Sequence, residues 1–439
     1  MIYPQYEHLV DSKVAWIQQK PRHWRVKRLK FAVDLINCKV NVDSSLLPYI
    51  GLEHIESWTG RKIDGEISNS EGLASQFLAG DVLFGKLRPY LAKAHLAEED
   101  GLISSEALVI RCSDEIYAGF LLYYILSRDF INVVDSSTYG SKMPRASWDF
   151  IGNLPVLLPE IEEQKSIARF LDFKTAQIDS LIAKQQSLLD KLAEKRTALI
   201  SHAVTKGLDP SVLMKDSGVA WLGKVPEHWQ VLPLRRLIHN VKTGTTPSGV
   251  NECHFDDEGT AWFRPGDFSD QIFLNSAEKY LSEEGVAEVR VFPIHTVMHV
   301  GIGATIGKVG VTTMRASCNQ QINAIVCNEK LHDLFAAYFL QSIRDFIVRC
   351  GKYTTLPIIN QDETKSLIFT VPPIGEQIRI TTFLLQEEEK IAAQRLKITE
   401  IIDRLNEYRS VLITNAVTGK IDVRGIHIPQ SAELCVKEI

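Results

Sequence analysis

Residues 11–24 read DSKVAWIQQKPRHW, and residues 216–229 read DSGVAWLGKVPEHW, so the chain contains nearly the same stretch twice. The identities extend from Asp11 to Val26 and recur at a constant offset of 205 residues. A chain of 439 residues is too long for one hydrophobic core and is expected to divide into two or more domains. The repeated stretch predicts that these domains are two related copies.

A second repeated block lies further along each copy. PEIEEQKSIARFL from Pro159 corresponds to PPIGEQIRITTFL from Pro372, and RTALISHAVTKGLD from Arg196 corresponds to RSVLITNAVTGKID from Arg409, both at an offset of 213. A period of about half the chain indicates two large copies and not a solenoid of short repeats. The residues between the blocks show only scattered matches. Each copy is therefore a constant frame around a divergent middle.

The second block predicts a long helix in each copy, over 159–207 and over 372–419. Apolar residues recur every seven positions, acids follow a proline in the first turn, and a glycine stands at each end. The helices, at 1.5 Å per residue, would each be roughly 65 Å long. The predicted apolar seam consists of Ile178, Leu181, Leu188, Leu192 and Leu199 in the first helix and Ile391, Ile398, Ile401, Leu405 and Leu412 in the second.

A helix of this length cannot bury its seam on its own small domain, so the expected partner of each helix is its twin. Two equivalent helices related by a two-fold axis perpendicular to them run antiparallel, as in an isologous interface. The alternative is that each helix packs on something else, in the same chain or on a partner chain.

Both middles predict short strands followed by a helix. GDVLFGKLRPYLAKA (80–94) and SEALVIRC (105–112) precede a helix-like GFLLYYILSRDFI, and HTVMHVGIGATIGKVGV (295–311) and NQQINAIVC (319–327) precede LFAAYFLQSIRDFIV. The predicted fold class is therefore α+β: two mixed α/β domains separated by two long helices in an antiparallel coiled coil, with internal pseudo-two-fold symmetry.

Composition excludes several classes of protein. A formal net charge of -5 argues against a chain that coats nucleic acid or anionic membrane by bulk electrostatics, so any basic surface must be local. The longest apolar runs are far shorter than the roughly 20 residues of a membrane span, and no leader opens the chain, which predicts a cytoplasmic protein. Seven cysteines without CxxC spacing predict buried free thiols and no metal site.

Three stretches resemble catalytic or binding motifs without meeting their requirements. VGIGATIGKVG (300–310) has the wrong glycine spacing for a phosphate loop and Val309 lacks the hydroxyl that binds magnesium, so a glycine-rich hairpin is expected. His295 and His299 lie in a strand-like run, which does not bring both rings to one helical face. A loose nuclease-like set of acids and a lysine after Pro159 is not retained in the second copy. The sequence predicts no catalytic residue in this chain.

Local positive charge is interleaved with aromatic and turn residues. KPRHWRVKRLK (20–30) carries six Lys or Arg and no acid. Such side chains suit phosphate contacts and hydrogen bonds to base edges, whereas the alternative for any one of them is an ordinary solvated charge. The candidate DNA-binding residues are Lys86, Arg88, Tyr90, Lys142 and Arg145 in the first copy and Lys242, Thr245, Arg264, Lys308, Lys352, Tyr353 and Thr354 in the second.

The chain resembles the specificity subunit of type I restriction-modification systems over nearly its whole length. The resemblance is carried by DSGVAWLGKVPEHW, GDVLFGKLRPYLAKA, GATIGKVGV followed by CNQQINAI, SKMPRASWDFIGNLPVLLPEIEEQ and the two long helices. It implies a non-catalytic subunit with two target recognition domains, each reading one half of an asymmetric, interrupted DNA sequence, and with the long helices as a spacer.

The resemblance also implies partners and domain limits. The expected partners are double-stranded DNA, two modification subunits that bring S-adenosylmethionine and methylate adenine, and two motor-nuclease subunits that use ATP and Mg²⁺; this chain itself is expected to hold no cofactor and no metal. The expected limits are 1–158 for the first frame segment and target recognition domain, 159–207 and 372–419 for the spacer helices, 208–371 for the linker and second target recognition domain, and 420–439 for a tail.

Three other functions stay open: the specificity subunit of a stand-alone methyltransferase without a motor nuclease, a coiled-coil scaffold, and a nucleotide-binding enzyme. The duplicated frame with unlike middles favours DNA recognition, because neither an enzyme nor a plain scaffold has reason to duplicate its support and diversify its tips. A rigid pair of helices that carries two readers would fix the gap between two half-sites.

Overall fold

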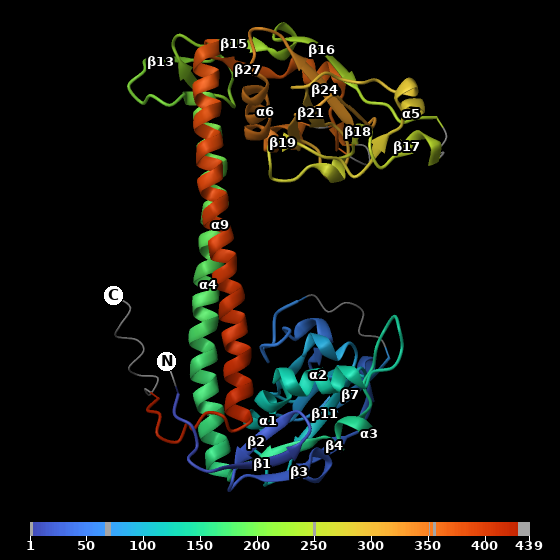
Figure 1. Ribbon diagram of the computed structural model, residues 1–439, viewed down its shortest axis with the longest axis vertical. Coiled ribbons are helices and arrows are strands. Elements are labelled where there is room, and N and C mark those ends of the chain that lie inside the picture. Colours follow the sequence, from blue (N-terminus) through green and yellow to red (C-terminus); the bar gives the residue numbers. More distant parts are fainter. Residues whose placement is uncertain (1–2, 66–71, 249–251, 351, 354–356, 429–439) are drawn as a thin grey trace. The chain divides into compact units, whose positions relative to one another are not determined.

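The computed structural model describes residues 3–65, 72–248, 252–350, 352–353 and 357–428 (Figure 1). The chain forms two compact units, each of which contains one half of both long helices. Unit 1 comprises Met1–Gln186 and Thr399–Ile439, and unit 2 comprises Ser187–Ile398. Unit 2 is thus continuous in sequence, whereas unit 1 is built from two separate segments of the chain.

The main sheet of unit 1 is antiparallel and has the strand order β4-β11-β8-β9. Its strands are β4 (Val33–Ile36), β8 (Val82–Gly85), β9 (Ala94–Leu96) and β11 (Ala107–Cys112), followed in the chain by helices α1 (Ala118–Ile125) and α2 (Arg128–Ser136). Helix α1 packs on β8 and β9, and Phe120, Tyr124 and Phe130 from the two helices fill the core beside the sheet.

The other strands of unit 1 form three further sheets. A second sheet has the order β5-β7-β10-β6, with β5 (Lys39–Asn41), β6 (Tyr49–Ile50), β7 (Leu73–Phe77) and β10 (Gly101–Ser104). The frame supplies two pairs, β1 (Leu9–Val14) with β2 (Ile17–Pro21) and β3 (Arg25–Arg28) with β12 (Pro155–Leu158). The short helix α3 (Trp148–Ile151) precedes β12.

Unit 2 repeats the main sheet with one added strand, in the order β16-β24-β21-β22-β19. Its strands are β16 (Ile238–Thr243), β19 (Phe273–Leu274), β21 (Val297–Val300), β22 (Val309–Thr312) and β24 (Ile322–Cys327), and β24 is followed by α6 (Asp333–Ser342) and α7 (Arg344–Cys350). The predicted order of strands and then helices is therefore confirmed in both units, and the two main sheets have the same order along their first four strands.

The second sheets differ between the units. Unit 2 has the order β17-β20-β18-β23, from β17 (Phe255–Asp256), β18 (Thr260–Phe263), β20 (Tyr280–Leu281) and β23 (Ala316–Cys318). Strand β23 precedes β24 as β10 precedes β11, yet β23 lies at the edge of its sheet and β10 lies inside. The remaining elements of unit 2 are β13 (Met214–Asp216), β14 (Lys224–Pro226), β15 (Gln230–Pro233), β25 (Lys352–Tyr353), β26 (Pro357–Ile358), β27 (Ile368–Val371), α5 (Glu283–Glu288) and α8 (Gln361–Ser366).

The two repeated sequence blocks meet in space within each unit. In unit 1 the Trp24 indole N–H donates to Glu163 over 3.2 Å, and the His23 ring lies 2.9 Å from the other oxygen of that carboxylate. In unit 2 Trp229 and His228 contact Glu376 in the same way, over 3.2 and 2.8 Å. The repeated residues are therefore those that join the start of the frame to the start of a long helix.

A buried glutamine makes a second repeated contact. The Gln164 amide accepts from the Tyr117 N–H over 2.8 Å and donates to the Pro159 carbonyl over 3.0 Å. Gln377 accepts from the His332 N–H over 2.8 Å and donates to the carbonyl of Pro372 over 2.9 Å. Each glutamine ties the first turn of its long helix to the segment that leads into the first helix of the divergent middle.

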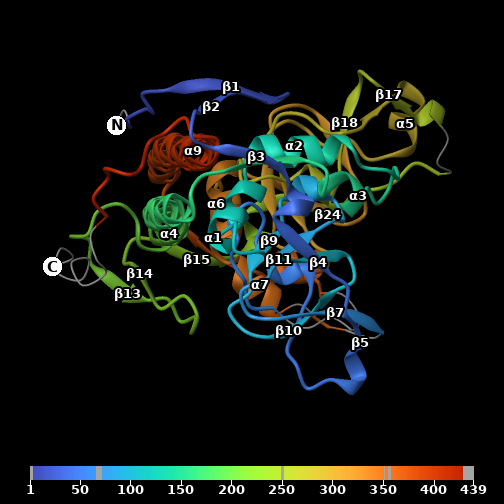
Figure 2. The ribbon, with the colours of Figure 1, turned by 90° about the horizontal axis from the view of Figure 1, so that it is seen from below.

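The long helices are α4 (Ile161–Lys206, 46 residues) and α9 (Ile374–Val417, 44 residues), so the prediction of two long helices is confirmed. In unit 1 the first part of α4 packs on the last part of α9, where Arg409 pairs with Asp179 over 3.1 Å (Figures 1 and 2). In unit 2 the last part of α4 packs on the first part of α9, where Arg196 pairs with Glu388. Within each unit the start of one helix therefore pairs with the end of the other.

The apolar seam is narrower than the sequence predicts. Ile178, Leu192, Ile391, Ile398 and Leu412 are buried, and Leu199 and Leu405 are half-buried. Leu181, Leu188 and Ile401 are 47%, 44% and 43% exposed, so the prediction that they are buried in the seam is wrong. Two helices cover only one stripe of each other, and the second apolar position of the repeat falls on the flank of that stripe.

Two expectations from composition concern cysteines and membranes. Among the described cysteines, Cys318 is buried, but Cys38 and Cys253 are exposed, so uniform burial is wrong. Within the described ranges, no helix combines the length and the apolar character that crossing a bilayer would require.

Candidate nucleic-acid interface

Three loops of unit 1 meet at one end of its main sheet, where β8 ends and β11 begins. They form loop cluster 1, defined as residues 86–93, 104–106 and 139–147. Backbone hydrogen bonds join them: the Lys86 N–H donates to the Glu106 carbonyl over 2.9 Å, and the Ala146 N–H donates to the Lys86 carbonyl over 3.0 Å. The Arg88 N–H donates to the Pro144 carbonyl over 2.8 Å. The three loops therefore form one surface at the end of the main sheet.

Loop cluster 1 carries cations around one carboxylate. Arg145 donates twice to Glu106, from Nε to Oε2 over 2.9 Å and from Nη2 to Oε1 over 3.1 Å. The Arg145 guanidinium holds the pKa of the Glu106 carboxyl below its usual range, and Lys86 and Lys39 act in the same direction. Burial and the charge of Lys86 lower the pKa of Lys39. The carboxylate therefore orients one arginine within a positively charged group.

The equivalent loops of unit 2 are joined by the same backbone hydrogen bonds. They form loop cluster 2, defined as residues 243–246, 301–308, 319–321 and 358–360. The Gly301 N–H donates to the Gln321 carbonyl over 2.8 Å, and the Ile359 N–H donates to the Gly301 carbonyl over 2.8 Å. Gly301 therefore corresponds to Lys86, and Gln321 corresponds to Glu106.

A third correspondence concerns the arginine itself. Ile302 and Ile358 form an isolated β-bridge in unit 2, and Leu87 and Arg145 form the same bridge in unit 1. An isoleucine thus occupies the position of Arg145. The charged group of loop cluster 1 has no counterpart at these positions of loop cluster 2.

Amides and hydroxyls dominate loop cluster 2 instead. The Thr246 hydroxyl donates to Gln320 Oε1 over 2.5 Å, and the Asn319 amide donates to Gln321 Oε1 over 3.0 Å. A hollow of about 410 Å³ opens among these side chains. It is lined by Thr243, Gly301, Ile302, Gln320, Gln321, Asn323, Ile358, Ile359, Asn360, Gln361 and Asp362.

All five candidate residues of unit 1 lie in loop cluster 1. Arg88 and Tyr90 are exposed on the loop that follows β8, and Lys142 is exposed in the turn before Arg145. Lys86 is half-buried at the start of the first loop. The structure thus brings together residues that come from two stretches more than fifty positions apart in the sequence.

The candidates of unit 2 are more scattered. Lys242 is exposed on β16, and Thr245 lies in loop cluster 2, where its hydroxyl accepts from a backbone N–H over 3.1 Å. Arg264 forms an ion pair with Glu278 over 2.5 Å. Lys352 and Tyr353 form β25, but their side chains, like all of Thr354, lie outside the described residues.

The stretch that resembles a phosphate loop is a hairpin turn. It joins β21 to β22, which pair antiparallel, as the glycine-rich sequence predicts. Lys308 donates its ammonium group to the Phe268 carbonyl over 2.8 Å, and Lys93 donates to the Leu52 carbonyl over 2.6 Å in the equivalent turn of unit 1. Both lysines therefore bind the backbone of their own domain.

The two histidines that follow His-x-x-x-His spacing do not meet. His299 is fully buried on β21, neither ring nitrogen has a hydrogen-bond partner among the described residues, and burial lowers its pKa to about 4. His295 is exposed and lies 2.9 Å from Asp333. Across the described part of the chain, no group of three or more His, Cys, Asp or Glu is placed to hold a metal ion.

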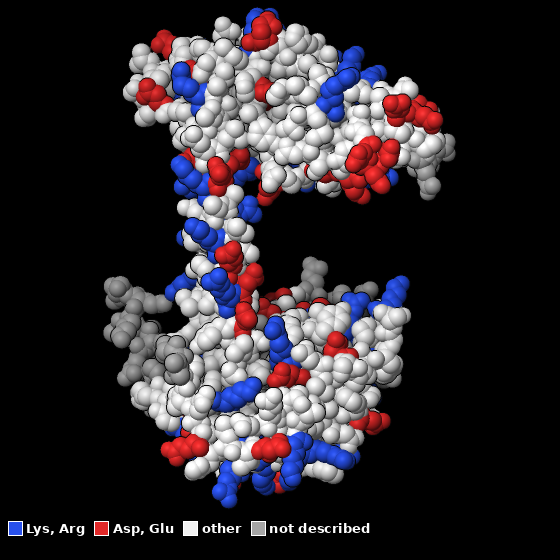
Figure 3. Space-filling model, viewed as in Figure 1, with Lys and Arg blue, Asp and Glu red and all other residues white. Residues whose placement is uncertain are grey.

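The basic run 20–30 lies away from loop cluster 1. Figure 3 shows Lys and Arg gathered along the lower edge of unit 1, beneath β3. Arg22, Arg25, Arg28 and Lys30 are exposed there. This strip adjoins the start of β4, whereas loop cluster 1 lies at the opposite end of the same sheet. The strip is therefore not part of the candidate interface.

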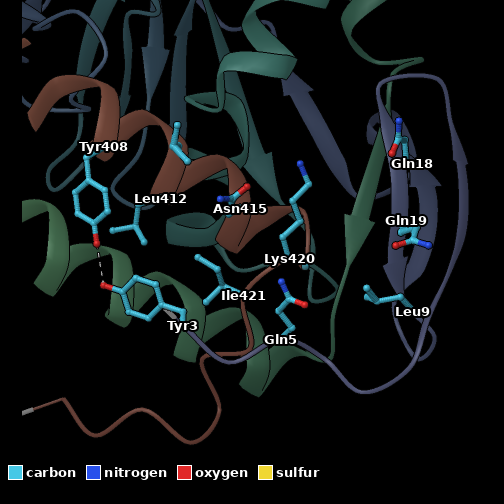
Figure 4. Close-up of a pocket in the computed structure, with 12 residues that line it drawn as sticks. Tyr3, Gln5, Leu9, Gln18, Gln19, Tyr408, Leu412, Asn415, Lys420 and Ile421 are labelled. Atoms are coloured by element: carbon cyan, nitrogen blue, oxygen red, sulfur yellow. Dashed lines mark hydrogen bonds between the residues drawn. The ribbon is translucent and has the colours of Figure 1, made fainter. Parts of the chain in front are cut away.

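A cavity of about 490 Å³ lies in unit 1 between the β1-β2 pair and the end of α9 (Figure 4). The Tyr3 and Tyr408 hydroxyls meet at its rim over 3.2 Å. Its lining consists of Tyr3, Gln5, Leu9, Gln18, Gln19, Tyr408, Val411, Leu412, Asn415, Gly419, Lys420 and Ile421. The lining holds one cation, Lys420, and two tyrosines, but no carboxylate, histidine or thiol.

Sequence reasoning missed four residues: Glu106, Thr246 and Gln320 in the two clusters, and Lys39 on β5, whose charge acts on Glu106. None belongs to a basic run, and a search for positive charge passes over amides and hydroxyls. The available signal was the shared order of strands, because matching GDVLFGK (80–86) to HTVMHVG (295–301) would have placed Glu106 opposite Gln321.

The comparisons with known proteins agree with this arrangement. Residues 226–403 match the family model described as "Type I restriction modification DNA specificity domain". The putative type I restriction enzyme MjaX specificity subunit of Methanocaldococcus jannaschii is 22% identical, over 94% of this chain and 97% of that protein. The MjaVIII specificity subunit of the same organism is 23% identical, over 93% of this chain and 95% of that protein.

Two solved structures share the fold. A chain from a study of complex assembly and conformational transition of the type I R-M system has a TM-score of 0.72 at 17% identity, covering 92% of this chain and 99% of that chain. The HsdS subunit from Thermoanaerobacter tengcongensis has a TM-score of 0.51 at 18% identity, covering 92% and 98%. The resemblance drawn from the sequence motifs is confirmed.

Proposed function

Because the chain is a specificity subunit of the type I restriction-modification family, we infer that it reads DNA through loop clusters 1 and 2. The observation that carries this inference is the pair of clusters. The same backbone hydrogen bonds hold both, yet Glu106 and Arg145 in one are replaced by Gln321 and Ile358 in the other. Base identity is read by side-chain hydrogen bonds in the major groove. Two loop clusters with the same backbone and different side chains are therefore suited to recognise two different DNA sequences.

The target is asymmetric and has two parts. The first target recognition domain, within 1–158, reads one half-site, and the second, within 208–371, reads the other. The helices over 159–207 and 372–419 act as the spacer between them. This division is supported by the sequence, in which the frame repeats and the middles do not.

Methylation and cleavage belong to partner subunits. Two modification subunits bring S-adenosylmethionine and methylate adenine, and two motor-nuclease subunits use ATP and Mg²⁺ to cleave DNA. The side chains of the two loop clusters are suited to hydrogen bonding, which supports a role in recognition for this chain.

DNA binding by the isolated chain is weak and strengthens when partners close around the duplex. The formal net charge of -5 supports this, since electrostatic attraction to phosphate normally requires a basic protein. Titrating labelled duplex with the chain alone and with its modification subunit tests the point. Tight, sequence-specific binding by the isolated chain would contradict it.

The decisive experiment exchanges one divergent middle. Residues 30–150 are replaced by the middle of another specificity subunit, the chimaera is expressed with the modification subunit, and methylated adenines are mapped across the host genome. One half of the methylated sequence is expected to change and the other to stay. A change in both halves, or in neither, would overturn the assignment of one half-site to each domain.

A coiled-coil scaffold without DNA makes a different prediction. Charge reversal at Lys86, Arg88 and Lys142 would leave a scaffold intact, because all three lie in loop cluster 1 and outside the helix pair. A DNA reader loses methylation at its target after the same change. Measuring methylation together with complex assembly separates the two functions.

A further inference from the structure

Arg145 is held so that one edge of its guanidinium stays available to a ligand. Glu106 accepts from Nε and from one hydrogen of Nη2, over 2.9 and 3.1 Å. A guanidinium has five N–H donors in a plane, so the Nη1 and outer Nη2 hydrogens form a second, parallel pair. Nη1 lies 3.5 Å from the Met143 carbonyl, at the limit of a hydrogen bond, and the side chain is 35% exposed.

The other groups around Arg145 are also donors. Lys86 and Lys39 lie close enough to Glu106 to lower its pKa, and both Glu106 oxygens already accept from Arg145. A surface that offers donors in a plane fits a base edge with two acceptors. Guanine presents such an edge in the major groove through N7 and O6, whereas adenine presents one donor beside its acceptor.

Gln320 is held in a comparable way in unit 2. Its side chain is exposed, and the Thr246 hydroxyl donates to its Oε1 over 2.5 Å. An amide offers a donor and an acceptor side by side, and Oε1 keeps a second lone pair. Ile358 and Gly301 stand where unit 1 has Arg145 and Lys86, so no cation occupies these positions beside it. An amide edge matches adenine, whose N6 donates and whose N7 accepts.

We propose that unit 1 reads a guanine through Arg145, oriented by Glu106, and that unit 2 reads an adenine through Gln320, oriented by Thr246. The proposal rests on the proposed function and adds the class of base that each half-site contains. The hydrogen bonds to Glu106 and from Thr246 restrain the two side chains, which lowers the conformational entropy that DNA binding must overcome.

The test uses the full chain expressed with its modification subunit, and the methylated sites are mapped genome-wide. Arg145→Lys keeps the charge and removes the planar fork, and Gln320→Ala removes the amide. Arg145→Lys is expected to relax one G·C pair in one half-site, and Gln320→Ala one A·T pair in the other half-site. The methylation rate on sites with the wrong base, relative to the wild-type site, is expected to rise about tenfold to a hundredfold.

Two control variants match these changes outside the clusters. Arg111 binds Asp81 through the same two-bond geometry, with both contacts at 2.8 Å, at the far end of β11, so Arg111→Lys is expected to leave the target unchanged. Gln271 is exposed in unit 2 outside loop cluster 2, so Gln271→Ala is expected to behave like the wild type. Glu106→Gln, which loosens Arg145 without removing it, is expected to relax the same G·C pair to a smaller extent.

Several results would overturn the proposal. Relaxation of a pair other than G·C by Arg145→Lys, or other than A·T by Gln320→Ala, refutes the assignment of bases. An equal loss of methylation at every sequence shows that these residues contact phosphate only. If Arg145→Lys and Gln320→Ala relax the same half-site, the proposal is also refuted. A wild-type complex with no two-part target would instead refute the proposed function, so the two failures are distinguishable.

Discussion

Trp24 donates its indole N–H to the Glu163 carboxylate over 3.2 Å, and this bond helps to join the two sequence blocks that the chain repeats. Trp229 and Glu376 form the same bond over the same distance in unit 2. The bond explains why tryptophan and glutamate recur at two different offsets: each offset belongs to one block, and the blocks meet only in space.

Trp24→Phe is expected to destabilise unit 1 by about 1 to 3 kcal/mol, because it leaves a buried carboxylate without one of its donors. Urea unfolding measures the loss. Trp229→Phe should cost unit 2 a similar amount, whereas Trp221→Phe, at an exposed position, should cost little. Equal stability of all three variants would show that the indole N–H contributes nothing to the frame.

Arg409 is the buried arginine of the helix pair in unit 1, with a side chain that is 7% exposed. It contacts Asp179 over 3.1 Å and donates to the Trp58 carbonyl over 2.7 Å. Arg409→Met is expected to cost about 2 to 3 kcal/mol of unfolding free energy, because the Trp58 carbonyl loses its Arg409 donor and Asp179 is left with Arg61 alone. Arg404→Met, at an exposed site on the same helix, is the control and is expected to lie within about 0.5 kcal/mol of the wild type.

His299 makes the stability of unit 2 depend on pH. Its pKa is about 4 in the folded protein because of burial, against an ordinary value near 6.5 in an unfolded chain. The unfolded chain binds the proton more tightly, so stability is full above about pH 6.5 and falls as the pH drops towards 4, by a total on the order of 3 kcal/mol. Unfolding free energies at pH 7.5, 6 and 5 should fall less steeply for His299→Leu than for the wild type. Identical slopes would contradict the assignment.

Lys308→Met tests whether Lys308 has a structural role or binds a nucleotide. The variant should lose about 1 kcal/mol of stability, because the hydrogen bond to the Phe268 carbonyl disappears. Lys93→Met should lose a similar amount in unit 1. Calorimetric titration with ATP is expected to give the same result for the wild type and for Lys308→Met. Binding of ATP that depends on Lys308 would restore the enzymatic alternative.

The sequence predicts the frame well, because a residue pattern that occurs twice in the chain indicates the same structure in both copies. The helices expected over 159–207 and 372–419 run over Ile161–Lys206 and Ile374–Val417. The width of the seam could not be predicted in the same way. Leu181 and Ile401 follow the apolar repeat, yet how much of a flank a partner helix covers depends on the packing of the pair and not on the repeat.

The candidate interface was predictable only where it is charged. Loop cluster 1 is visible in the sequence as GKLRPY and YGSKMPR, whose lysines and arginines mark it. Loop cluster 2 is built from Gln320, Thr246 and their neighbours, and such residues are common in any polar turn. The role that we propose for them rests on the backbone hydrogen bonds that place Gln321 where Glu106 stands, and these bonds join segments far apart in the chain.

Because unit 1 is built from two separate segments of the chain, the two units can complete their folds at different times during synthesis. Unit 2 is complete once residue 398 has been synthesised, whereas unit 1 must wait for the last turns of α9 and for Asp422, whose N–H donates to the Pro4 carbonyl over 2.8 Å. The first domain to leave the ribosome is thus the last to close. A premature stop after residue 398 would leave unit 2 able to fold, and would leave unit 1 incomplete and exposed to proteases and chaperones.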